Sequence, residues 1–145
     1  MKSLVLLSLA IFTSAAFACT DFSGNYMDEL SNNFTITQNA CKSLQFISSE
    51  LTMNIIVDGK EHLVSEFDMS IEGESELTNV KIFATSIFQN EKLVNNIKAV
   101  ITSPDASVDI QRNWSESFLN ENRDMVNVTH FEDGSTITDV DSRVN

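Results

Sequence analysis

The chain has 145 residues and contains 21 Asp and Glu against 9 Lys and Arg, which gives a formal net charge of −12. This acidic balance argues against nucleic acid and anionic membrane surfaces as partners. The length suffices for one domain with a substantial core, and no linker or internal repeat divides it. We therefore expect a single domain over residues 19–145, without stable insertion in a membrane.

Residues 1–18 have the organisation of a secretory signal peptide. Lys2 supplies the positive start, Leu4 to Phe12 form an apolar run, and Ala16-Phe17-Ala18 fits the small-x-small cleavage rule. The run is shorter than the ~20 residues that a membrane-spanning helix needs. We expect cleavage before Cys19 and a secreted or periplasmic protein.

Cys19 would be the first mature residue, which is also where a lipoprotein carries its lipid. Lipoprotein signals usually have Leu three residues before that Cys and a small residue two before it, whereas this chain has Ala16 and Phe17. A disulfide between Cys19 and Cys41 is the simpler expectation for two cysteines in an exported chain. Closing a loop of about 23 residues stabilises a fold by roughly 3 kcal/mol. A lipoprotein is the alternative.

The composition after residue 18 favours strands, because β-branched Ile, Val and Thr are abundant while Ala and Leu are few. Apolar and polar residues alternate over 67–72, 80–84 and 108–111, which is typical of strands with one face on a core. Asp58-Gly59 and Asp133-Gly134 are hairpin turn signals, each between two such runs.

Further turn signals occur at 72–74, 89–91, 103–105 and 120–122. Counting the runs between them predicts an all-β fold, an antiparallel meander of about 8–10 strands. We expect a closed or partly open barrel, with a β-sandwich as the second choice. Residues 92–101 also fit a helical period, although Asn95-Asn96 favour a strand, and 27–31 are compatible with a short helical turn.

Sequence motifs for catalysis are missing, and we expect no enzymatic activity, no cofactor and no metal. His62 and His130 are the only histidines, and the four glycines lie too far apart to form a phosphate-binding loop. Asn120-x-Asn122-x-Asp124 resembles the first half of an EF-hand loop, but its Gly and final Glu are absent. A polar loop between strands is the expectation there.

The stretch Asp21-Phe22-Ser23-Gly24-Asn25-Tyr26 resembles the first motif of lipocalins and related calycin barrels. In those proteins a Gly-x-Trp opens the first strand, and the aromatic ring plugs one end of the barrel. Tyr26 takes the place of the Trp here, and the resemblance implies that Arg143, after the last strand, packs on its ring. It also implies an internal site for a small apolar ligand.

Two functions follow as expectations. The first is a non-catalytic binding protein whose barrel holds a hydrophobic small molecule. The second is a structural or interaction protein with a filled core and an acidic protein-binding surface, whose partner the sequence does not identify. Five aromatic residues are candidates to line the cup or to fill the core: Phe46, Phe67, Phe83, Trp114 and Phe118.

Overall fold

The computed structural model describes residues 19–70 and 76–144, whose regular elements are all β-strands. The expected signal peptide, Ile71 and the turn at 72–74 lie outside these residues. The strands are β1 (Gly24–Met27), β2 (Asn33–Asn39), β3 (Ser43–Ser48), β4 (Thr52–Ile56), β5 (Glu61–Ser70), β6 (Leu77–Gln89), β7 (Lys92–Thr102), β8 (Val108–Leu119), β9 (Met125–Phe131) and β10 (Thr136–Val144). The described residues contain no helix long and apolar enough to cross a membrane.

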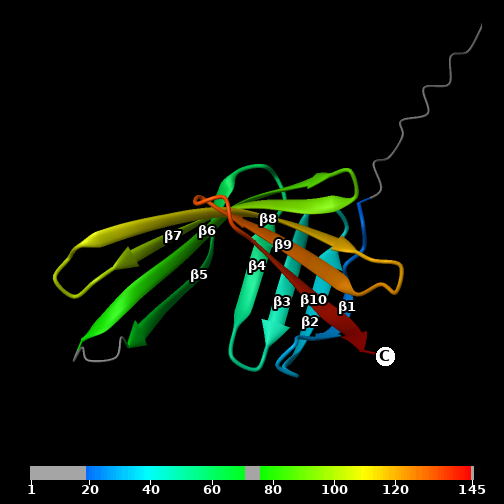
Figure 1. The fold of residues 1–145 in the computed structure, drawn as a ribbon, viewed down its shortest axis with the longest axis horizontal. Helices are drawn as coiled ribbons and strands as arrows, with labels where there is room; N and C mark the ends of the chain where they lie inside the picture. Colours follow the sequence, from blue (N-terminus) through cyan, green and yellow to red (C-terminus); the bar gives the residue numbers. More distant parts are fainter. Residues whose placement is uncertain (1–18, 71–75, 145) are drawn as a thin grey trace, which may run out of the picture.

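The ten strands form one antiparallel sheet in the order β4-β3-β2-β1-β10-β9-β8-β7-β6-β5. β1 pairs with β10, where Tyr26 is opposite Arg143, so the two ends of the chain meet inside the sheet. The edge strands β4 and β5 lie beside one another without pairing. The fold is therefore a nearly closed barrel with an unsealed seam, which confirms the predicted all-β meander (Figure 1).

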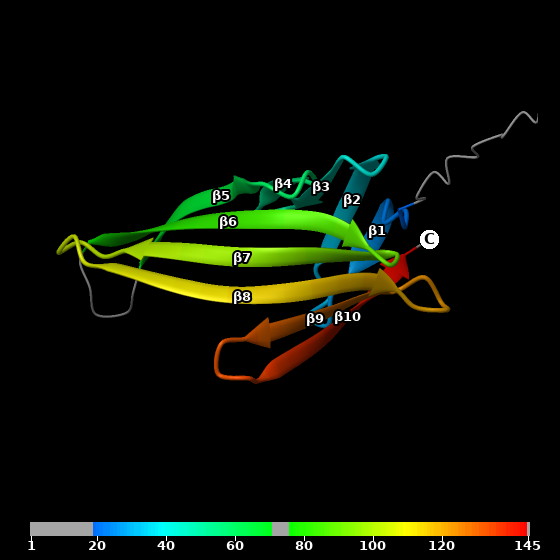
Figure 2. The same ribbon diagram turned by 90° about the horizontal axis from the view of Figure 1, so that it is seen from above.

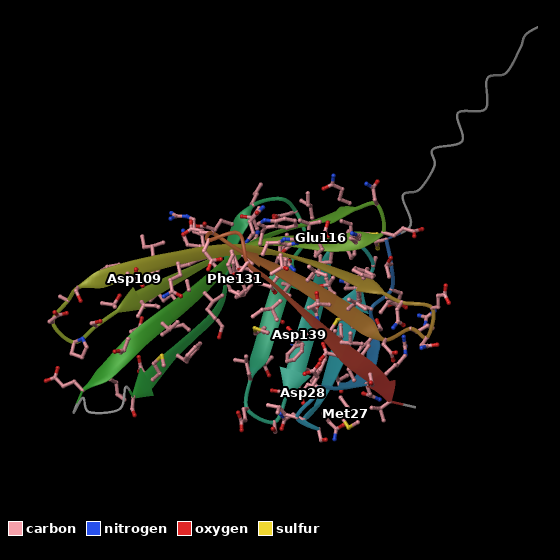
Figure 3. All side chains as sticks on the ribbon, in the orientation of Figure 1. Met27, Asp28, Asp109, Glu116, Phe131 and Asp139 are labelled. Atoms are coloured by element: carbon pink, nitrogen blue, oxygen red, sulfur yellow. A yellow bond between two sulfur atoms is a disulfide. The ribbon has the colours of Figure 1, made fainter. Side chains whose placement is uncertain are left out.

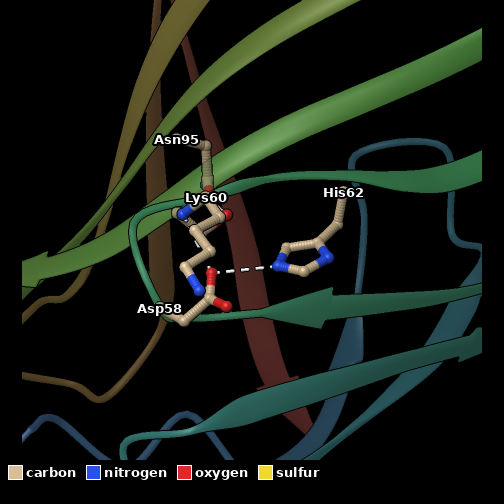
Figure 4. Close-up of polar contacts among 5 residues, drawn as sticks. Asp58, Lys60, His62 and Asn95 are labelled. Atoms are coloured by element: carbon tan, nitrogen blue, oxygen red, sulfur yellow. Dashed lines mark hydrogen bonds and ion pairs between the residues drawn. The ribbon is translucent and has the colours of Figure 1, made fainter.

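The seam is where a sequence prediction was wrong, because Asp58-Gly59 does not form a hairpin. Gly59 has a φ of 73° and its N–H donates to the carbonyl of Ser86 on β6, at 3.1 Å. The Asp58 carboxylate accepts from the Lys60 N–H and lies 2.9 Å from His62 Nε2 (Figure 4). The turn is therefore bonded to β6, and the strand that follows it, β5, pairs with β6 instead of with β4.

The other turn signals that the structure describes join paired strands. Asp133-Gly134 connects β9 to β10 in a hairpin, and Gly134 has a φ of 85°. Asn90 and Glu91, both at positive φ, make the tight turn between β6 and β7. Residues 92–102 are strand β7, which confirms the strand interpretation, and 27–31 hold the end of β1 and a turn rather than a helix.

The long strands extend past the short ones. In Figures 1 and 2 the far ends of β5 to β8 project beyond β1 to β4, which cover only one part of the sheet's inner face. The buried apolar cluster lies in the covered part, around Phe22, Tyr26, Phe34, Ile36 and Leu44. The barrel interior is therefore enclosed mainly where β1 to β4 face the long strands.

Candidate functional site: a cavity between two different walls

A cavity of about 420 Å³ lies inside the barrel. In the order of the sheet, β3 and β8 stand five strands apart, so β2 to β4 face β7 to β9 across the interior. The lining residues are Phe22, Asp28, Phe34, Ile36, Leu44, Phe46, Ile55, Leu93, Asn95, Ser115, Ser117, Met125, Asn127, Thr129, Asp139 and Asp141. Most of them divide by strand into two chemically different walls, while Leu93 and Met125 add apolar contacts on the side of β7 and β9.

The apolar wall consists of Phe34, Ile36, Leu44, Phe46 and Ile55, on β2, β3 and β4. Phe34 and Phe46 stack with ring centroids 4.5 Å apart, and Phe34 also stacks on Tyr26 at 5.5 Å. Apolar residues alternate with polar ones along these strands, so one face packs inward and the other meets water. This wall offers a continuous aromatic and aliphatic surface to the cavity.

The polar wall consists of Asn95, Ser115, Ser117, Asn127, Thr129, Asp139 and Asp141, on β7 to β10. Its side chains hydrogen-bond to one another across the strands. Ser117 Oγ donates to Asn127 Oδ1 at 2.7 Å, and Asn127 Nδ2 donates to Asp141 Oδ2 at 2.9 Å. Buried polar groups are tolerated when they are paired in this way. The wall presents amide, hydroxyl and carboxyl groups to the cavity.

Asp141 is the most perturbed acid of the site. Only 9% of its surface is exposed. Burial raises the pKa of Asp141 from 3.8 to about 6, and the negative charges of Asp139, Asp28 and Glu29 add to the effect. Asp28 and Asp139, both labelled in Figure 3, line the cavity. Asp139 is exposed, so the cavity reaches solvent beside it.

A plug closes the barrel next to the cavity. Tyr26 is fully buried, and its hydroxyl donates to the carbonyl of Phe22 at 2.8 Å. The Arg143 guanidinium lies 5.8 Å from the centre of the Tyr26 ring and donates to the carbonyl of Ser23 at 2.7 Å. A Cβ on Gly24 would stand 2.9 Å from this guanidinium, so glycine leaves the space that Arg143 occupies. The packing of Arg143 on Tyr26 agrees with the resemblance, but Arg143 lies within β10 and not after the last strand.

Cys19 and Cys41 form a disulfide with a Cα–Cα distance of 5.5 Å. The bond ties the segment before β1 to the turn between β2 and β3, beside the plug. It is compatible with an extracellular or periplasmic location.

The five candidate aromatics do not gather in the cavity. Phe46 lines it, and Phe67 is on the inner face of β5 but 40% exposed and outside the lining. Phe83, Trp114 and Phe118 correct the expectation, because they lie on the outer face of the sheet. Each alternates with an inward neighbour that is small or polar, such as Ala84 on β6. Alternation predicts two faces but does not say which of them is inside.

Sequence reasoning missed the polar wall entirely. The available signal was the run 113–117, where polar Asn and Ser alternate with Trp and Glu, so neither face is conventionally apolar. The EF-hand-like segment is a turn, in which Asn120 Oδ1 accepts from the N–H groups of Asn122 and Asp124. Within residues 19–70 and 76–144, no group of three or more His, Cys, Asp or Glu side chains is placed to hold a metal ion.

In comparisons with known proteins, no family model, no curated protein and no solved structure matches this chain.

Proposed function

We propose that this chain is an exported β-barrel protein that binds a small apolar or amphipathic molecule in its cavity and catalyses no reaction. The observation that supports this most is the cavity of about 420 Å³ between an apolar and a polar wall. Ligand pockets span roughly 300–1,000 Å³. A core packed only for stability leaves few voids larger than a water molecule. The plug of Tyr26 and Arg143 supports the resemblance to lipocalins as part of the same proposal.

The charges around the cavity indicate which end groups the ligand carries. Three of the lining residues are acidic, namely Asp28, Asp139 and Asp141, and the described lining contains no Lys, Arg or His. An anionic head group would meet uncompensated negative charge in a partly desolvated site. The preferred ligand therefore has an apolar body against the β2–β4 side and a neutral or cationic polar end against Asn127 and Asp141.

Export is the second part of the proposal. The signal-like residues 1–18 and the disulfide between Cys19 and Cys41 support it. Mass spectrometry of the exported protein should give an unmodified N-terminus at Cys19. An acyl mass increment on Cys19 would show a membrane-anchored lipoprotein instead.

The binding proposal is tested with the dye N-phenyl-1-naphthylamine, whose fluorescence rises in apolar surroundings. The native protein should bind it saturably. Ile55→Trp places a large side chain in the cavity and should weaken binding by about tenfold or more. Ile56→Trp is the matched control, because Ile56 is the next residue on β4, points outward and is 42% exposed. That variant should bind like the native protein.

Competition with the dye then tests the polar end of the ligand. Dodecylamine and dodecanol should displace the dye, and dodecanoate should need about tenfold or more higher concentration. Equal competition by dodecanoate would contradict the charge argument while leaving the cavity as a binding site. Absence of any dye binding, or equal binding by both Trp variants, would refute the proposal and favour an interaction protein with a filled core.

A further inference from the structure

A second depression, of about 440 Å³, lies on the outer face of the sheet, opposite to the cavity. Strand register places five of its side chains in one row across β5 to β9: Glu61, Thr85, Asn96, Trp114 and His130. The neighbours of Trp114 along β8 point the other way, and Ser115 lines the interior cavity. The outer row is therefore a separate surface on the same strands.

Trp114 gives this surface a flat apolar element. Its indole stacks on the His130 imidazole with centroids 3.7 Å apart and planes 6° from parallel. Trp114 is nevertheless 40% exposed. Because His130 covers one face of the indole, the exposed area belongs to the other face and to the ring edges. The indole is thus held in a fixed orientation by its neighbour and has exposed area inside the depression.

The polar side chains around Trp114 have hydrogen-bonding capacity that the described part of the chain does not use. Thr85, Asn96 and Arg112 make no side-chain hydrogen bond to any described residue, in contrast to the paired groups of the polar wall. His130 Nε2, on the same face as Trp114, is buried in the depression without a partner. Buried polar atoms are nearly always paired with protein, water or ligand. The unused hydrogen-bonding capacity of these side chains is available to a polar ligand.

The formal charges of the depression cancel in a chain whose net charge is −12. Glu61 and Glu132 are balanced by Lys98 and Arg112. Lys98 Nζ lies 2.6 Å from Glu61 Oε1, so that pair is already neutralised internally. A charged ligand would gain little here, whereas a neutral molecule with both donors and acceptors would match the surface.

We propose that this depression binds a neutral saccharide, with one sugar ring stacked on the open face of Trp114. A pyranose ring has an apolar face of C–H groups and a rim of hydroxyls that both donate and accept, which fits an aromatic face bordered by Thr85, Asn96 and Arg112. From Trp114 to Glu61 the row crosses three strand spacings, about 14 Å. A short oligosaccharide running across the strands from β8 towards β5 would contact the whole row. This site is independent of the ligand in the barrel interior.

The test uses the intrinsic fluorescence of the full mature protein, because Trp114 is its only tryptophan. Cellohexaose, maltohexaose, chitohexaose, mannohexaose and xylohexaose are titrated up to about 10 mM, which reaches the weak end of specific binding. At least one should shift or quench the emission saturably, and its monosaccharide should bind more weakly. If none of the five does so, the proposal is wrong.

Calorimetry with the best oligosaccharide then locates the contact. Trp114→Ala and Asn96→Ala should each weaken binding, the first by about tenfold or more, as expected for a central aromatic contact. Ile110→Ala is the matched control, since Ile110 is on the same strand and outer face, is 45% exposed and lies outside the depression. It should leave affinity unchanged. Unaltered binding by Trp114→Ala, or an equal loss with Ile110→Ala, would overturn the proposal. Far-UV circular dichroism and a denaturant melt report whether each variant is folded.

Discussion

The two walls of the cavity differ in the kind of side chain that faces the interior. On β2 to β4 the apolar side chains face inward, as is usual for an antiparallel sheet with one solvated face. On β8 and β9 the pattern is inverted, because Ser117 and Asn127 face the interior while Trp114 and Phe118 lie outside. Turning polar groups inward costs free energy unless they are paired, and here they form hydrogen bonds with one another. We therefore propose that the apolar wall mainly stabilises the fold, whereas the polar wall contacts the ligand.

The largest loss of unfolding free energy is expected when the packing beside the apolar wall is disrupted. Tyr26→Ala removes a fully buried ring that stacks on Phe34 and lies under Arg143, and should cost about 3–5 kcal/mol of unfolding free energy. Trp114→Ala, on the outer face of the inverted wall, should cost only about 1 kcal/mol. Denaturant melts of both variants measure the contrast. Equal costs would mean that the two sides of the barrel are packed alike.

The disulfide should contribute next most, because it joins the segment before β1 to the turn between β2 and β3. Replacing Cys19 and Cys41 together by Ser should lower the unfolding free energy by about 3 kcal/mol. The native protein should show no thiol that reacts with an alkylating reagent before reduction. Two reactive thiols in the folded exported protein would contradict this part of the structure.

The third prediction concerns the polar wall and its dependence on pH. Since the folded pKa of Asp141 is raised to about 6, the folded protein holds a proton that the unfolded chain has released, so stability falls as pH rises from about 4 to 6. Asp141→Asn should therefore match the native protein near pH 4 and exceed its stability near pH 8, by about 3 kcal/mol. Acids with a lowered pKa, such as Asp21 and Asp133, act in the opposite direction at lower pH and are common to both proteins. A variant less stable than the native protein at high pH would contradict the burial of Asp141.

The smallest effect tests the pairing of inward polar groups. Ser86 Oγ donates to Asn95 Oδ1 at 2.7 Å, and both residues are buried. Ser86→Ala should cost about 1–2 kcal/mol, because it leaves the Asn95 amide oxygen without its donor. The double variant Ser86→Ala, Asn95→Leu should recover most of that loss in a thermal melt. If the double variant is as unstable as the sum of the single ones, the two side chains do not act as a pair.

Local sequence signals predicted the strands and most turns. The features that they did not predict depend on contacts between residues far apart in the sequence. Asp133-Gly134 forms its hairpin because the neighbouring runs pair directly, whereas at Asp58-Gly59 the bond from Gly59 to Ser86 on β6 prevails. The plug at Tyr26 had a sequence motif. The polar wall had no such motif. The register of β8 with β7 and β9, and not the alternation within β8, determines which face of β8 points inward.

The central claim, a hollow interior that holds a ligand between unlike walls, is tested most directly by a crystal structure of the protein grown with N-phenyl-1-naphthylamine. The account predicts electron density for the dye between Phe46 and Asn127, with its rings against the β2–β4 side. Density for the dye only on the outer surface would contradict it, as would an interior in which side chains of the two walls touch and fill the space.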